Sequence, residues 1–235
     1  MPPRRVPQFV LWGIYALVVL VHLGSLLAGG GMVQRVTQPM FALLLMAIIL
    51  VSAPLRNRTV ALIIAGLFFA WLGDTLPPFL PDALRPGAVV MFLMALVLYC
   101  VALAPLWARN RDPLRLALAI PYAGVVIGLF VACADGAGEM MPLVALYAIV
   151  LAAMAFLSSG GNGLTWMGGT LFLLSSSLLA MDWFLPGAAI LLSTVWVMLT
   201  YALGQAFLVA GILRMVPSRE REVPALGAEL VIVEG

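Results

Sequence analysis

The chain has 235 residues, of which 64% are hydrophobic and 9% are charged, and its formal net charge at pH 7 is +2. This composition excludes a soluble globular domain, and the length leaves room for roughly eight membrane-spanning helices of about 20 residues each. The small positive charge does not indicate nucleic-acid binding, because the basic residues lie between the apolar segments.

Apolar runs bounded by Arg, Pro and Gly predict an all-α polytopic membrane protein with eight transmembrane helices. The predicted spans are residues 8–28, 35–53, 59–78, 87–107, 114–134, 140–158, 164–183 and 188–213. They form one transmembrane domain over residues 1–213. Residues 214–235 mix Arg, Glu and Pro without periodicity, which predicts a disordered cytoplasmic tail.

The basic residues predict the orientation of the spans. All twelve are arginines, and with a cytoplasmic N-terminus ten of them lie on the cytoplasmic side. The two on the other side are Arg35 and Arg85. This asymmetry follows the positive-inside rule and places both termini in the cytoplasm, as expected for an integral protein of a bacterial cell membrane.

A faint internal repeat indicates that the two halves of the chain correspond. Asp74 lies 102 residues before Ser176, and Tyr99 lies 102 residues before Tyr201. Span three then corresponds to span seven, and span four to span eight. This pattern predicts a four-plus-four arrangement of parallel repeats around one central site.

Asp74 is the strongest candidate for a functional residue. It lies well inside the third span, where a carboxyl group costs about 2.5–3.5 kcal/mol and normally faces a bundle interior or a watery cavity. At about 1.5 Å rise per residue, it lies ~22 Å from the cytoplasmic face, in the outer half of the membrane.

Other polar side chains are expected at a depth similar to that of Asp74, which is consistent with one shared cavity: His22, Tyr99, Ser175, Ser176, Ser177 and Tyr201. Each also has a structural explanation. Serines inside helices often bond to the carbonyl one turn earlier, a histidine near a helix end is often interfacial, and buried tyrosines often have satisfied hydroxyls. Cys100 and Cys133 lie in apolar spans, so we expect no disulfide, no metal site and no cofactor.

Three short stretches resemble the YhhN family of membrane proteins, which includes the lysoplasmalogenases. Residues 72–76 are similar to the family's Gly-Asp motif, and residues 168–180 to its glycine-led Ser-Asp-Ser-Leu-Leu-Ala segment. Residues 200–205 are similar to its tyrosine-to-glutamine signature, and residues 37–39 to a Lys-Pro entry to the second span. The order and spacing of these motifs carry the resemblance over most of the chain.

The resemblance implies hydrolysis of the vinyl ether bond of a lysoplasmalogen, a lysophospholipid of the membrane. Protonation of the alkene carbon gives an oxocarbenium ion that water captures, so a buried carboxylic acid is a suitable proton donor. By this resemblance Asp74 is the general acid, while Ser176 and Tyr201 orient water or the glycerol hydroxyl. The implied substrate-binding residues are His22, Arg35, Arg85, Tyr99, Ser175, Ser177 and Gln205, with the arginines meeting the lipid phosphate.

The departures from the family pattern leave the function open. Ser176 stands where the family usually has Asp, Leu96 where it often has His, and Gln38 where it has Lys. A second carboxylate that stabilises the cation is therefore missing. The resemblance favours a hydrolase, and the missing carboxylate is consistent with a reduced activity. A lipid-binding or structural protein without chemistry, and a proton-coupled transporter that uses Asp74, remain alternatives.

Overall fold

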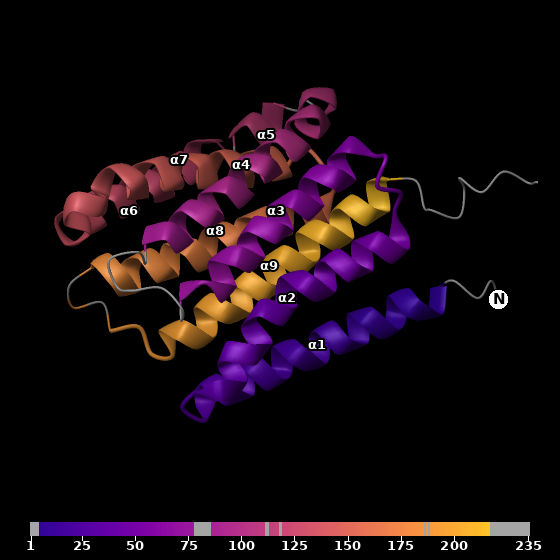
Figure 1. Cartoon of the computed structure of the whole chain (residues 1–235). Helices are drawn as coiled ribbons and strands as arrows, with labels where there is room; N and C mark the ends of the chain where they lie inside the picture. The colour runs from indigo at the N-terminus through magenta and orange to yellow at the C-terminus, as the bar shows by residue number, and fades with distance from the viewer. Residues whose placement is uncertain are drawn as a thin grey trace, which may run out of the picture.

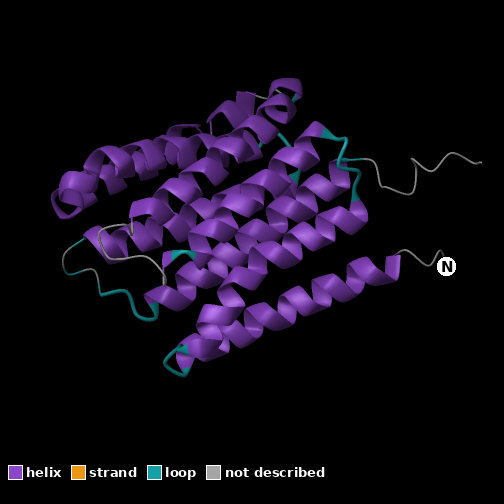
Figure 2. Cartoon of the chain, in the orientation of Figure 1, coloured by secondary structure: helices purple, strands orange, loops and turns teal. Residues whose placement is uncertain are grey.

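The computed structural model describes residues 5–77, 86–110, 113–117, 119–185, 187 and 189–216. Within these ranges the chain is helical and contains no strand (Figure 2), which confirms the all-α prediction. The predicted site residue Arg85 and most of the predicted tail, from residue 217 onward, lie outside the described residues.

The helices follow the predicted spans to within a few residues, except at the eighth, which begins later than predicted. In chain order they are α1 (Arg5–Leu27), α2 (Met32–Ser52), α3 (Arg58–Thr75), α4 (Pro86–Arg109), α5 (Pro113–Ala117), α6 (Ala119–Ala137), the 3-10 helix η3 (Gly138–Met140), α7 (Met141–Ser158), α8 (Gly163–Phe184) and α9 (Ser193–Met215).

Within the described residues, seven helical stretches are long and apolar enough to cross a membrane. One of them, Arg115–Ser158, is 44 residues long and contains α6, η3 and α7. The chain reverses at η3, where Gly138 has a positive φ of 49°, and α6 then packs against α7. The protein is therefore an all-helical membrane protein.

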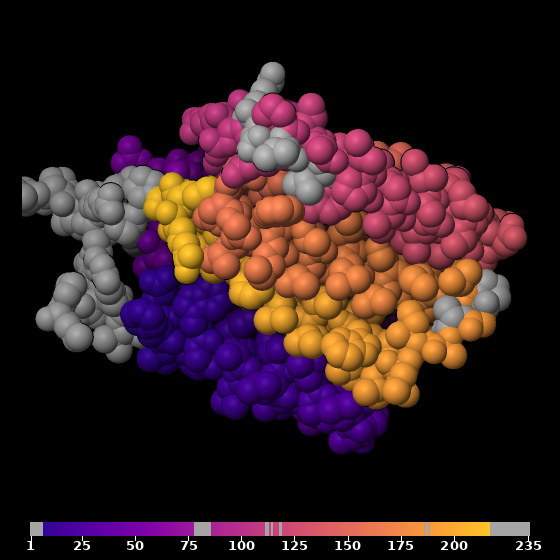
Figure 3. Space-filling view, turned by 180° about the vertical axis from the view of Figure 1, so that it is seen from behind, coloured from indigo at the N-terminus to yellow at the C-terminus, as the bar shows by residue number. Residues whose placement is uncertain are grey.

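The long helices run in alternating directions (Figure 1). Six of them form a closed ring of contacts. Each of the following packs against the next, and the last packs against the first: α2, α3, α4, α7, α8 and α9. Outside the ring, α1 packs against α2 and α9, and α6 packs against α7 and α8. Seen from behind, α1 and α6 lie on opposite sides of the α8–α9 surface (Figure 3).

Two asparagines define where α3 and α8 begin. Asn57 Oδ1 accepts hydrogen bonds from the amides of Thr59 (2.9 Å) and Val60 (3.3 Å). Asn162 Oδ1 accepts from the amides of Leu164 (3.0 Å) and Thr165 (3.1 Å). Both are N-caps, which satisfy amides that a helix start leaves free.

The backbones of α8 and α9 approach each other closely, because glycines lie at the crossing. A Cβ atom on Gly168 would lie 2.5 Å from the amide nitrogen of Leu208 and 2.8 Å from the carbonyl oxygen of Gly204. Small residues that let backbones touch are typical of helix pairs in membranes. This contact fixes the height of Tyr201 on α9 against the serines of α8.

Candidate functional site

Asp74 lies inside the ring, where side chains from three helices meet. It is 7% exposed. Its Oδ1 accepts a hydrogen bond from Gln38 Nε2 on α2 (2.9 Å), and its Oδ2 accepts one from the Tyr201 hydroxyl on α9 (2.7 Å). In the described part of the chain no basic side chain is among its partners. Asp74 is thus held by neutral donors in an interior without a compensating cation.

A cavity of about 400 Å³ begins at Asp74 and is called the central cavity here. Its wall is mainly apolar, with polar groups at a few points. It is lined by Gln38, Gly73, Asp74, Pro77, Ala88, Val89, Phe92, Leu129, Phe130, Cys133, Val144, Tyr147, Ala148, Leu151, Phe172, Ser175, Ser176, Leu179, Ala180, Trp183, Phe184, Val197, Met198 and Tyr201. An apolar pocket with few polar groups suits a ligand that has a long hydrocarbon part.

The cavity lies in the half of the bundle that carries the α1–α2 turn. Its lining residues come from the ends of α3, α6 and α8 and from the beginnings of α4, α7 and α9. Because successive helices run in opposite directions, these segments all belong to the same half (Figure 1). The aromatic rings of Phe92 and Phe172 meet the ring of Tyr201 edge-on, at centroid distances of 5.9 and 5.6 Å.

The three serines of α8 take three different positions. Ser176 lines the cavity, and its Oγ lies 3.1 Å from the Tyr147 hydroxyl of α7. Ser175 also lines the cavity, but it donates to the carbonyl oxygen of Val197 (2.8 Å). Ser177 is buried, is not among the cavity residues, and has no hydrogen-bond partner within the described structure. The cavity therefore brings Ser175 and Ser176 together with Asp74, but not Ser177.

Tyr99 and Gln205 lie outside the cavity wall, in the packed interior. Tyr99 is 0% exposed and Gln205 is 1% exposed. The Tyr99 hydroxyl donates to Gln205 Oε1 (3.0 Å). Neither residue is among the described residues that line the central cavity.

His22 is likewise buried away from the cavity. Its Nδ1 lies 2.8 Å from Thr37 Oγ1, and its ring packs edge-on against Phe41 at 5.0 Å. Thr37 donates its own proton to the carbonyl of Val33 (2.7 Å), so the Nδ1–H of His22 is the donor between the two side chains. His22 joins α1 to α2 and is not part of the cavity wall.

The predicted arginine contacts cannot be assigned to the cavity. Arg35 lies near the start of α2, its side chain is exposed, and it is not among the lining residues. Arg85 is outside the described residues.

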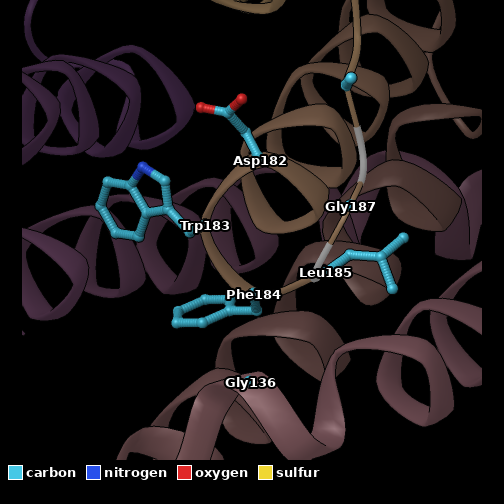
Figure 4. A pocket seen from close by; sticks show the side chains of 7 residues that line it. Gly136, Asp182, Trp183, Phe184, Leu185 and Gly187 are labelled. Carbon is cyan, nitrogen blue, oxygen red and sulfur yellow. The ribbon is translucent and has the colours of Figure 1, made fainter.

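A second, more open recess adjoins the central cavity, with which it shares Trp183 and Phe184. Figure 4 shows the side chains of the recess. It is formed by Gly136, Asp182, Trp183, Phe184, Leu185, Gly187 and Ala189. Asp182 accepts a hydrogen bond from the Ser193 hydroxyl (2.8 Å) and is exposed. Trp183 and Phe184 line both spaces, whereas Asp182 lines only the recess. Asp182 is not a second acid for the site of Asp74.

Sequence reasoning missed two residues that contribute polar groups to the cavity. Gln38 had been noted only for replacing a lysine, yet it is one of the two donors to Asp74. Tyr147 has no motif around it, yet it is the partner of Ser176. Gln38 had a usable signal, because it is a polar side chain in an apolar span at a depth near that of Asp74.

Comparison with known protein families decides the relationship. The model of the YhhN family matches residues 33–212, which is most of the chain. The protein belongs to the YhhN family. Searches of curated proteins and of solved structures each found no match. The YhhN match extends from α2 to α9, so all the helices of the ring, and the cavity residues on them, lie within it.

Proposed function

We propose that this YhhN protein is a membrane-embedded hydrolase of the lysoplasmalogenase type. It would cleave the vinyl ether bond of a lysoplasmalogen and release a fatty aldehyde and a glycerophospho-alcohol. One observation carries the proposal: a carboxyl group whose hydrogen-bond donors in the described part of the chain are both neutral borders an apolar cavity that also presents hydroxyl groups. The expected ligand is a membrane lysophospholipid, whose hydrocarbon chain suits the apolar wall.

In this mechanism Asp74 is the general acid. Apolar surroundings disfavour the charged form of a carboxyl group, so a neutral Asp74 is a suitable proton donor. Its proton passes to the alkene carbon of the vinyl ether, and the electron pair of the double bond forms the new C–H bond. The products of this step are the Asp74 carboxylate and an oxocarbenium ion.

Water completes the reaction. A water molecule held by Ser176 and Tyr147, whose oxygens lie 3.1 Å apart on the cavity wall, adds to the oxocarbenium carbon. Its released proton returns to Asp74. The resulting hemiacetal then collapses to the aldehyde and the alcohol, so no cofactor or metal is consumed. Tyr201 and Gln38 keep the carboxyl group in place throughout, since each donates to one of its oxygens.

The proposal includes eight membrane crossings, with both termini in the cytoplasm. The 44-residue stretch Arg115–Ser158 would cross twice, because α6 and α7 are packed against each other with a short turn between them. The packing also supports a four-plus-four repeat. The pairs α1–α2, α2–α3 and α3–α4 correspond to α6–α7, α7–α8 and α8–α9, and the contact of α2 with α9 corresponds to that of α7 with α4.

The test is aldehyde release from a lysoplasmalogen by purified protein in lipid nanodiscs. We expect activity in the wild type and a loss of about 100-fold or more in Asp74→Asn, because positioned acids contribute 10²–10⁴-fold. Asp182→Asn is the matched control, since it makes the same change at an acid outside the cavity. Equal rates for wild type and Asp74→Asn would remove Asp74 from the mechanism.

A second candidate is a lipid-binding protein of the same fold that carries out no chemistry. It is favoured by the cavity wall, which contains one carboxyl group in the described residues, with Ser176 where a second acid is expected. Ser176→Asp separates the two. A large gain in hydrolysis from an inactive wild type would indicate a decayed catalytic site, whereas binding of lysolipid without turnover in both proteins would support the second candidate.

A further inference from the structure

A second set of polar groups lies directly behind Tyr201, on the side away from the cavity. Gln205 is one turn along α9 from Tyr201, and its Oε1 accepts the hydrogen bond from Tyr99 on α4 (3.0 Å). Both side chains are almost completely buried. Tyr99 can occupy this place because residue 66 is a glycine, on which a Cβ atom would overlap the Tyr99 ring.

The amide nitrogen of Gln205 is an unused donor in this interior. The side chain lies against the Tyr201 hydroxyl. Its Nε2 is buried, and within the described residues it does not complete a hydrogen bond of ordinary geometry. Native proteins rarely leave a buried donor unpaired, so such a group calls for an explanation. Because Tyr99 occupies the carbonyl end of the amide, the donor end is the one available to Tyr201.

We propose that Gln205 and Tyr99 are positioning residues that stabilise the ionised form of Asp74 through Tyr201. The inference rests on the proposed function, in which Asp74 alternates between a neutral acid and a carboxylate. In the ionised form the Tyr201 hydroxyl donates to a charged acceptor, which makes its own oxygen a stronger acceptor. The Gln205 N–H then donates a hydrogen bond to the Tyr201 oxygen, while the Tyr99 hydroxyl donates to the Gln205 carbonyl oxygen.

Tyr99, Gln205, Tyr201 and Asp74 form a row in which each donor points toward Asp74. Tyr99 donates to Gln205, and Tyr201 donates to Asp74. Once the ionised form draws the Gln205 N–H onto Tyr201, each bond polarises the next toward the carboxylate. None of these groups except Tyr201 and Asp74 lines the cavity. The row therefore acts on the charge of Asp74 without touching a ligand, and its loss is expected to change turnover and not ligand binding.

The experiment compares Tyr99→Phe and Gln205→Met with Tyr15→Phe. Tyr15 is a suitable control because it is also buried and its hydroxyl also bonds to α9, at the carbonyl of Ala202 (2.7 Å), outside the row. For aldehyde release we expect kcat to fall about three- to tenfold in both row variants with KM unchanged. The double variant should be no slower than Gln205→Met alone, since Tyr99 acts through Gln205.

A second readout does not depend on catalysis. The infrared band of the Asp74 carboxyl group is assigned by its loss in Asp74→Asn. We expect this band to shift in Tyr99→Phe and in Gln205→Met, and to shift much less in Tyr15→Phe. An unmoved band in both row variants, or an equal shift in Tyr15→Phe, overturns the inference. If the wild type releases no aldehyde, the proposed hydrolase fails, while the band still decides whether the row reaches Asp74.

Discussion

Three glycines within helices provide a matched test of how tightly the interior behind Asp74 is packed. Gly66 and Gly73 are on α3, and Gly13 is on α1. A Cβ atom at Gly66 would overlap Cε1 of Tyr99 and lie 2.6 Å from its Cδ1, and one at Gly73 would lie 2.7 Å from Cε2 of Phe92. A Cβ atom at Gly13 meets no heavy atom within 4 Å.

The two contacted rings differ in the room they have to move. Tyr99 is 0% exposed and its hydroxyl is bonded to Gln205, so an alanine at residue 66 must overpack the interior. Overpacking costs about 1–3 kcal/mol, and replacing a glycine inside a helix by alanine returns about 0.5–1 kcal/mol. Gly66→Ala should therefore lower the free energy of unfolding by about 1 kcal/mol, and by at most about 2.5 kcal/mol.

Phe92 has space that Tyr99 lacks. It borders the central cavity of about 400 Å³, so its ring can turn into that space when residue 73 gains a methyl group. Gly73→Ala should leave the free energy of unfolding within about 0.5 kcal/mol of the Gly13→Ala protein, which reports helix propensity alone. The displaced ring narrows the cavity beside Tyr201, so we expect KM for a long-chain lysolipid to rise several-fold.

The measurement is equilibrium unfolding of the three variants and the wild type in the same lipid mixture, together with KM for aldehyde release. Gly13→Ala sets the reference for a glycine with no neighbour. If Gly66→Ala is as stable as Gly13→Ala, the interior around Tyr99 is looser than described. If Gly73→Ala loses as much stability as Gly66→Ala, the Phe92 ring cannot turn into the central cavity.

Three further substitutions test separate contacts. Tyr201→Phe should lower kcat about tenfold. A hydrogen bond to a charged acceptor stabilises by about 1–1.5 kcal/mol more than one to a neutral acceptor, and only this difference affects the rate. An unchanged kcat would mean that Asp74 does not ionise. Gly168→Ala should lower the free energy of unfolding by about 2 kcal/mol after the gain in helix propensity is subtracted. Its Cβ meets the backbone of Leu208, which cannot turn aside as a ring can. Denaturant unfolding measures this change. Asn162→Ala should cost about 1–2 kcal/mol in the same measurement, through loss of the cap of α8.

The sequence was sufficient to predict the helices and the depth of the polar groups. Long apolar runs ended by Gly, Pro and Arg predicted the long helices of the described residues, because a continuous apolar run of about 20 residues crosses a membrane as a helix. The rise per residue placed Asp74, Ser176 and Tyr201 at similar heights, and all three line the cavity. The eighth span was predicted too early, since α9 begins at Ser193 and not near residue 188.

The sequence could not predict the direction in which each side chain points around its helix. Tyr99 and Ser177 lie at depths near that of Asp74, but they face the packed interior because neighbouring helices cover them. The hydrogen bonds of Asp74 reach residues 36 and 127 positions away, and they depend on how α2 and α9 close the ring. Almost every face of these helices is apolar, so periodicity does not distinguish a lipid-facing side from a cavity-facing one.

In the proposed reaction, a cavity whose described wall contains one carboxyl group restricts how the oxocarbenium ion can be stabilised. Proton transfer from a neutral Asp74 to a neutral vinyl ether creates a carboxylate and a cation together, so the net charge of the cavity does not change. At a separation of about 4 Å and an effective dielectric constant of about 20, the two charges attract by about 4 kcal/mol. Asp74 can therefore serve first as donor and then as counter-charge, with Tyr201 and Gln38 each donating to one of its oxygens. A second acid would add attraction, but it would also place a charge in the cavity before the reaction begins, which the hydroxyls of Ser176 and Tyr147 avoid.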